Sequence, residues 1–87
     1  MNVHISNAIR LAPVIERVHG EHHPELTRVR ELTEQLPDAD ETELETLFRD
    51  LRDVTSNYTI PKGACEAFTE TYRVLQSADE EYASSQV

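Results

Sequence analysis

Apolar residues recur at intervals of three and four along most of this chain, which is the spacing of one face of an α-helix. The pattern predicts four helices and no strand. The first helix should cover about residues 3–19, and Pro13 inside it predicts either a kink or a short lead-in before a helix that begins there. Gly20 is expected to end this helix. Its main apolar stripe consists of Ile5, Ala8, Ile9, Ala12, Ile15 and His19, and a second stripe of Leu11, Val14 and Val18.

Prolines and a capping pattern delimit the second and third helices. The second helix should open at Pro24, because proline suits the first turn, and Pro37 should end it. Asp40, with Glu43 three residues later, resembles a capping box that starts the third helix. The apolar stripes are Leu26, Val29, Leu32 and Leu36 in the second helix, and Leu44, Leu47, Phe48, Leu51 and Val54 in the third.

The fourth helix is expected to use Thr59 as its cap and Pro61 in its first turn, and the tail from about residue 83 is expected to fray. Because short loops join consecutive helices, neighbours should be antiparallel. The sequence therefore predicts one all-α domain over residues 1–87, a small up-and-down bundle of four short helices. The stripe of the fourth helix is Ala64, Phe68, Thr71, Tyr72, Leu75 and Ala78.

The charge of the chain narrows the classes of partner. Seventeen Asp and Glu residues face eight Lys and Arg residues, which gives a formal net charge of −9. Such a surface repels phosphate backbones and anionic lipids, so we expect no nucleic-acid partner and no membrane partner. Lys62 is the only lysine. An acidic, lysine-poor composition raises the hypothesis of a salt-rich cytosol, where screening relieves self-repulsion.

The sequence indicates a cytoplasmic protein. No stretch is apolar over the ~18 residues that a membrane span needs. Residues 1–4 lack a basic region followed by an apolar one, so we expect no signal peptide. The single cysteine, Cys65, cannot form an internal disulfide, which fits a reducing compartment.

The short chain is expected to need a partner. A domain of 87 residues buries only ~60–65% of its unfolded surface, so its own margin of stability should be thin. We therefore expect a homo-oligomer or a protein partner. The stripe of Leu11, Val14 and Val18 is the candidate contact face.

Two stretches carry a resemblance to a known family. Residues 15–26 read I-E-R-V-H-G-E-H-H-P-E-L, similar to a V-E-x-V-H-G-x-x-H-P-x-L turn between two helices. Residues 56–65 read S-N-Y-T-I-P-K-G-A-C, similar to an N-x-T-P-P-x-x-A-C segment that leads into a last helix. Both patterns resemble the hemerythrin-like domain of iron–sulfur-cluster repair di-iron proteins. The resemblance implies a four-helix scaffold, which in that family holds two irons.

The iron ligands that the resemblance implies are missing. The family uses a histidine on the first helix, one on the third, and two His-x-x-x-Glu motifs at the ends of the second and fourth. Here no histidine follows His23, the second helix stops at Leu36, and residues 80–84 read E-E-Y-A-S. The ligand histidine of the third helix falls near Glu41, and His4 is a poor substitute for the early one. The resemblance therefore implies the scaffold and argues against the family's activity.

A different metal site is the main alternative. Glu16 and His19 are three residues apart on one helix face, with His22 and His23 in the following turn, so together they could bind Fe or Zn. The competing interpretation is that His19 caps the end of its helix while the others are solvated. The acidic run of residues 38–45 lacks EF-hand spacing and indicates a solvated helix face.

Cys65 is expected at the start of the last helix, a position at which thiols can be reactive. No histidine is near it in the sequence, so we favour a small buried apolar side chain.

The leading hypothesis is a non-catalytic binding or scaffold protein of hemerythrin-like descent, without a di-iron centre or other cofactor. The alternative is an iron- or zinc-binding protein of iron or nitric-oxide stress handling, using the histidine turn. An enzyme with a reactive Cys65 is the third.

Overall fold

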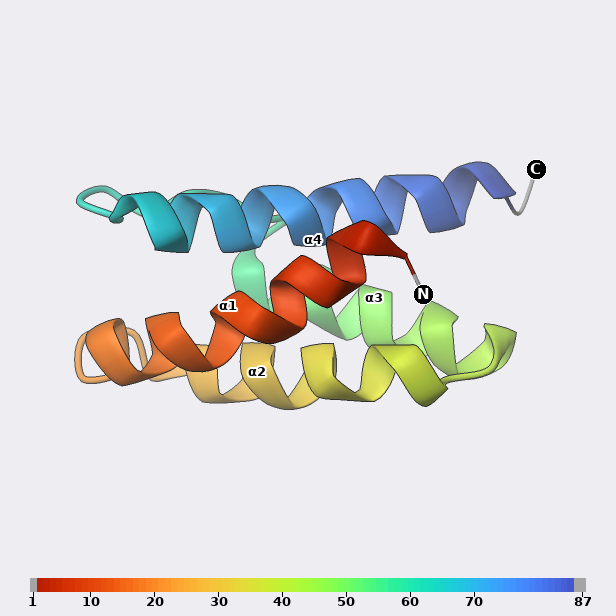
Figure 1. Cartoon of the computed structure of the whole chain (residues 1–87), viewed down its shortest axis with the longest axis horizontal. Coiled ribbons are helices and arrows are strands. Elements are labelled where there is room, and N and C mark those ends of the chain that lie inside the picture. Colours follow the sequence, from red (N-terminus) through yellow and green to blue (C-terminus); the bar gives the residue numbers. More distant parts are fainter. Residues whose placement is uncertain (1, 86–87) are drawn as a thin grey trace.

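The computed structural model describes residues 2–85, and its regular elements are all helical. They are α1 (Val3–His19), α2 (Glu25–Gln35), the short 3-10 helix η1 (Leu36–Asp38), α3 (Glu41–Thr55) and α4 (Glu66–Ser85). Consecutive α-helices run in opposite directions (Figure 1). Residues 2–85 contain no strand, so the prediction of a small all-α four-helix bundle is confirmed.

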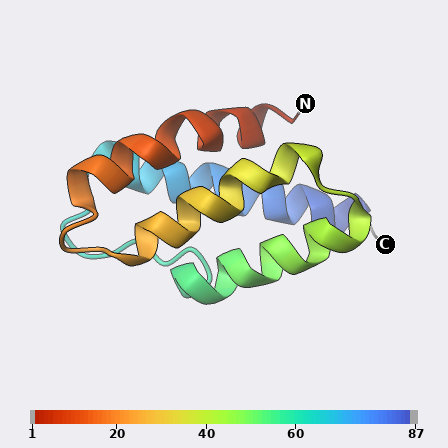
Figure 2. The same ribbon diagram turned by 90° about the horizontal axis from the view of Figure 1, so that it is seen from below.

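α1 packs against both α2 and α4, and α2 packs against α3. Seen from below, α2 lies between α1 and α3 (Figure 2). Both views place the turn from α1 to α2 and the loop that leads into α4 at the same end of the bundle (Figures 1 and 2). Segments more than forty residues apart in the sequence therefore meet at this end, as the His19–Cys65 contact shows.

α1 forms one continuous helix through Pro13, so the alternative of a separate lead-in is wrong. Asn2 starts the helix, because its side-chain oxygen accepts hydrogen bonds from the backbone N–H groups of His4 and Ile5. Gly20 follows the helix as predicted, and its N–H donates to the Glu16 carbonyl at 2.8 Å. A Cβ at Gly20 would collide with that same carbonyl, so the tight turn requires glycine.

α3 begins with the predicted capping box. The Glu43 N–H donates to Asp40 Oδ1 at 2.8 Å, and the Asp40 N–H donates to Glu43 Oε1 at 3.2 Å. The helix ends at Thr55. Its C-cap, Ser56, has a left-handed backbone with φ 53°, and Asn57 and Tyr58 follow with φ 60° and 61°. Three consecutive non-glycine residues in this region represent stored strain.

The start of α4 differs from the prediction. The helix begins at Glu66, so Thr59 does not cap it and Pro61 is not in its first turn. The intervening loop contains Gly63 with φ 83°, a left-handed conformation that breaks a helix. The residue that caps the helix is Cys65, whose Sγ accepts the Phe68 N–H at 3.4 Å.

α4 continues as helix to Ser85, although fraying was predicted from about residue 83. Ser85 Oγ donates to the Tyr82 carbonyl at 2.8 Å, and the Tyr82 hydroxyl donates to the Glu41 carbonyl at 3.2 Å. These bonds tie the last turn to itself and to α3. Residues 86–87 lie outside the described part of the chain.

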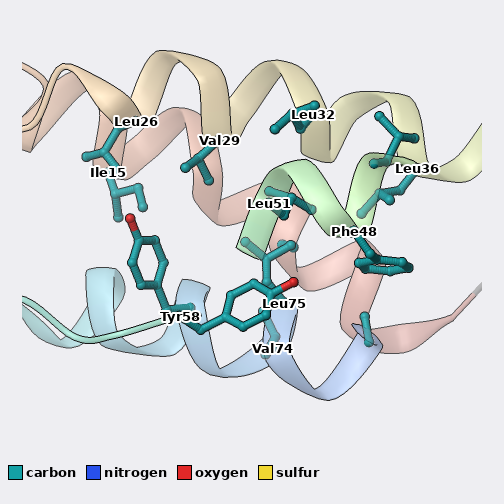
Figure 3. Packing of buried hydrophobic residues seen from close by; sticks show 14 of the residues in the cluster. Ile15, Leu26, Val29, Leu32, Leu36, Phe48, Leu51, Tyr58, Val74 and Leu75 are labelled. Carbon is teal, nitrogen blue, oxygen red and sulfur yellow. The ribbon is translucent and has the colours of Figure 1, made fainter. Parts of the chain in front are cut away.

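One apolar core occupies the middle of the bundle, and Figure 3 shows side chains from the helices meeting in it. It contains most of the predicted stripe residues, because the helical spacing places them on inward faces. Its buried members are Ala8, Ile15, Leu26, Val29, Leu32, Leu36, Leu47, Phe48, Leu51, Tyr58, Phe68, Tyr72, Val74, Leu75 and Ala78.

Candidate functional site at the histidine turn

The histidine turn and the start of α4 form one cluster around Phe68. The ring of His19 and the ring of His23 each lie edge-on to the Phe68 ring, with centroids 5.2 Å apart in both pairs. Phe68 is fully buried and packs in the same manner on Tyr72. The two imidazoles therefore cover the end of the apolar core, and their positions depend on it.

His19 and Cys65 are in direct contact, although 46 residues separate them in the sequence. His19 Nε2 lies 3.0 Å from Cys65 Sγ, and Cys65 is exposed. The prediction that Cys65 is a buried apolar side chain is therefore wrong. Cys65 precedes α4 and caps it, whereas the buried stripe of that helix begins at Phe68.

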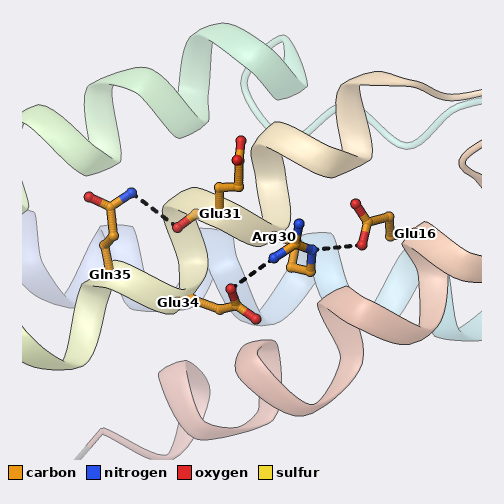
Figure 4. Close-up of polar contacts among 5 residues, drawn as sticks. All are labelled: Glu16, Arg30, Glu31, Glu34 and Gln35. Carbon is orange, nitrogen blue, oxygen red and sulfur yellow. Dashed lines mark hydrogen bonds and ion pairs between the residues drawn. The ribbon is translucent and has the colours of Figure 1, made fainter.

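Glu16, the first residue of the predicted metal set, pairs with a residue of α2 and not with the histidines. Its Oε1 accepts Arg30 Nε at 2.6 Å, and Arg30 also donates to Glu34 at 2.9 Å (Figure 4). A hydrogen bond from Thr27 and the Arg30 guanidinium hold the pKa of Glu16 below its usual value. Glu16 thus serves as the acid of an interhelix ion pair between α1 and α2.

The other predicted metal ligands do not converge on one point either. His23 Nδ1 lies 2.9 Å from Glu25 Oε2, and His22 is exposed. Within residues 2–85, no three His, Cys, Asp or Glu side chains are grouped so that they could hold a metal ion. The structure therefore brings His19 and His23 together around Phe68 but does not assemble Glu16, His19, His22 and His23 into one ligand set.

The predicted contact stripe on α1 is only partly exposed. Leu11 is 9% exposed and lies with Ala8 and Ile15 on the inner side of the helix, so its assignment to an exposed face is wrong. Val14 is half-buried, and Val18 is 63% exposed. A contact face on α1 would therefore have to rest on Val14 and Val18.

A buried polar contact, which the sequence analysis missed, holds the connection between α3 and α4. The Tyr58 hydroxyl donates to Asp79 Oδ2 at 2.7 Å, and Arg52 Nε lies 3.0 Å from the same oxygen. Tyr58 and Asp79 are both buried. Burial, and then the bond to Asp79, raise the pKa of the Tyr58 hydroxyl. A sequence signal existed, because Asp79 lies four residues after Leu75 on the apolar stripe.

A shallow pocket of about 280 Å³ lies beside the histidine turn. It is lined by His23 and Glu25, by the end of α3, and by Tyr72. Burial, and then the charge of Glu25, raise the pKa of Tyr72 to about 12. Tyr72 is therefore neutral at physiological pH and can offer only a hydroxyl to this pocket.

Comparisons with known proteins do not assign this chain to a family. No family model, curated protein or solved structure matches it. None of the helices described over residues 2–85 has the length and apolar character needed to cross a membrane.

Proposed function

We propose that this chain is a non-catalytic helical binding or scaffold protein of hemerythrin-like descent, whose interior is structural and whose surface carries the function. The observation that supports this proposal is the apolar filling of the bundle. Side chains from different helices, such as Ile15, Leu51 and Leu75, are fully buried and fill the middle of the bundle. Two irons require several nitrogen and oxygen ligands converging from different helices.

The residues do not fit a di-iron centre. Glu41, which stands near the position of the family's third-helix ligand, is exposed at the start of α3. No histidine follows His23 in the chain, so α3 and α4 carry none. Besides the hydroxyl of Tyr72, the buried polar side chains of α4 are Thr71 and Asp79, and both have hydrogen-bond partners within the chain.

Among the four α-helices, α1 carries the fewest carboxylates, so a second copy of this chain would meet the least repulsion of any helix face on its outer side. The chain carries a formal net charge of −9, yet residues 3–19 include only one carboxylate, Glu16, which Arg30 neutralises. Arg10 and Arg17 are exposed on this helix, together with Val18. The outward faces of α2, α3 and α4 each carry several carboxylates, so a contact between two copies there would set like charges together. We therefore place the contact of a homodimer on α1, around Val14 and Val18.

Light scattering after size exclusion tests this contact. Val18→Asp should weaken self-association at least about tenfold, equivalent to about 1.4 kcal/mol, because it buries a carboxylate in the interface. Val3→Asp is the matched control, since Val3 is 64% exposed on the same helix and lies four turns away. A chain that stays monomeric at high concentration would contradict the homodimer, and equal effects of both variants would contradict its placement around Val14 and Val18.

A metal-binding protein is the second candidate, and one contact favours it. His19 Nε2 and Cys65 Sγ are two ligand types that Zn²⁺ takes, and they lie side by side at an exposed edge. Two ligands do not make a structural site, so a second chain would have to supply the others. This candidate would bind iron or zinc in iron or nitric-oxide stress handling.

Zinc titration by calorimetry separates the two candidates. The metal-binding candidate requires a fixed zinc-to-chain ratio that is lost in His19→Ala and kept in His22→Ala, since the His22 side chain is exposed and only its backbone N–H bonds to His19. The scaffold proposal expects no saturable binding in any of the three proteins.

A further inference from the structure

One sulfur atom at the end of the bundle is contacted by two groups that can assist a nucleophile. Cys65 is the only cysteine of the chain and is exposed. His19 Nε2 lies 3.0 Å from its Sγ, and the Phe68 N–H points at the same sulfur from 3.4 Å. A nucleophile and a base within hydrogen-bond reach, with a backbone N–H that stabilises the thiolate at the start of a helix, are the parts of an activated thiol.

The ring of His19 and its backbone are each held by a contact within the bundle. Its ring lies edge-on to Phe68, which is fully buried. Its backbone carbonyl accepts the N–H groups of His22 and His23 at 3.1 and 2.8 Å, so the turn that follows it is hydrogen-bonded. Gly20 is required in this turn by the close approach of the Glu16 carbonyl. The base is therefore oriented by the packed core rather than by the sulfur it contacts.

The neighbouring imidazole does not compete for this role. His23 lies against the same Phe68 ring, but its Nδ1 is 2.9 Å from the Glu25 carboxylate. His19 has no carboxylate partner in the described ion pairs, so its Nε2 can accept the Cys65 proton when Nδ1 carries the ring proton.

We propose that Cys65 and His19 form a thiol–disulfide exchange site, at which the chain reversibly takes up the thiol half of a small neutral disulfide. The Sγ proton moves to His19 Nε2, and Sγ attacks one sulfur of the disulfide RS–SR. The Cys65 Sγ–SR bond forms as the S–S bond breaks, and the leaving RS⁻ takes the proton from His19. The Cys65 sulfur is oxidised and the leaving sulfur is reduced, so no further oxidant is needed.

The mixed disulfide cannot be resolved by a second cysteine of the same chain. Because no second cysteine exists in the chain to displace the RS group, the mixed disulfide persists until an external thiol reverses the exchange. The site is therefore one of reversible modification rather than of turnover, which is compatible with a scaffold whose surface carries the function.

The exchange rate with bis(2-hydroxyethyl) disulfide tests the proposal. The probe is neutral, so the acidic surface does not repel it, and mass spectrometry follows the adduct on the full chain at neutral pH. The same chain unfolded in guanidinium chloride gives the rate of an unassisted Cys65. Because a positioned base contributes about 100-fold or more in enzymes, we expect folded Cys65 to react at least roughly tenfold faster than unfolded Cys65.

Two substitutions at His19 and one control complete the design. His19→Gln and His19→Asn keep a polar side chain but cannot accept the proton at neutral pH, so either should lower the folded rate about tenfold. His22→Gln, three residues away and exposed, should leave it unchanged. Circular dichroism selects the variants that keep the fold. A folded rate no higher than the unfolded rate, or an unchanged rate in a folded His19 variant, would overturn the proposal.

Discussion

Tyr58→Phe removes a single hydroxyl from the contact that fastens the α3–α4 connection to α4. That hydroxyl donates to Asp79 Oδ2 at 2.7 Å, and both residues are 7% exposed. The substitution leaves Arg52 on the same carboxylate oxygen at 3.0 Å, so Asp79 keeps a charged partner. The change therefore isolates one buried hydrogen bond to a charged acceptor.

The expected loss follows from that geometry. Hydrogen bonds to charged groups contribute about 1.5–3 kcal/mol, and the remaining Arg52 contact places Tyr58→Phe at the lower end, about 1.5–2 kcal/mol. In a domain of this size, each kcal/mol corresponds to roughly 4–8 °C in Tm, so Tm should fall by about 6–16 °C. The released segment includes Ser56 and Asn57, whose left-handed backbones favour opening.

Urea and thermal unfolding followed by circular dichroism measure this loss. Tyr82→Phe is the matched control, because its hydroxyl donates to a carbonyl at 3.2 Å in an exposed setting, and its cost should stay within about 0.5 kcal/mol. Asp79→Asn completes a double-mutant cycle, in which the two changes should not add. Equal stability of Tyr58→Phe and Tyr82→Phe, or full additivity in the cycle, would refute the reasoning.

Four further predictions concern stability. Thr33→Val should stabilise the fold by about 1–2 kcal/mol in urea unfolding, because Thr33 is fully buried and its hydroxyl has no hydrogen-bond partner within the described residues. Ser56→Gly should stabilise it by about 1 kcal/mol, since Ser56 is exposed and left-handed; an unchanged urea midpoint would argue against strain there. Burial raises the pKa of Tyr72 to about 12, above the value of ~10 in an unfolded chain, so the contribution of Tyr72 to stability should be full below about pH 10 and fall as pH rises above it, and the alkaline loss of stability should be less steep in Tyr72→Phe. Tm should rise between low and molar salt, because screening relieves the repulsion of a net charge of −9; a flat response would remove the case for a salt-rich cytosol.

The sequence predicted those features that depend on neighbours along the chain. The capping box of Asp40 and Glu43 and the inward positions of most apolar stripe residues were confirmed, because both arise from spacing within one helix. The start of α4 was predicted too early, since Gly63 adopts a left-handed backbone and Cys65 supplies the cap. The contact of Cys65 with His19 had no local signal, because only the packing of α1 on α4 brings them together.

The residues of the predicted metal set are not brought together, also because of a contact between helices that has no local signal in the sequence. Spacing placed Glu16 near the histidines, but it could not show that Arg30, on the next helix, binds its carboxylate. Asp79 was visible as an acid on an apolar stripe, yet its partner Tyr58 lies 21 residues away and is positioned by an unusual backbone. Contacts between segments that are distant in the sequence therefore determine the partners of Glu16 and Asp79.

The measurement that tests the scaffold proposal most directly is elemental analysis of the full chain, purified in high salt without an affinity tag or chelator. The apolar interior predicts iron and zinc far below one atom per chain, equally in the native protein and in His19→Ala. Iron or zinc at a fixed ratio per chain, lost in His19→Ala, would contradict a purely structural bundle and would place a metal site at the histidine turn.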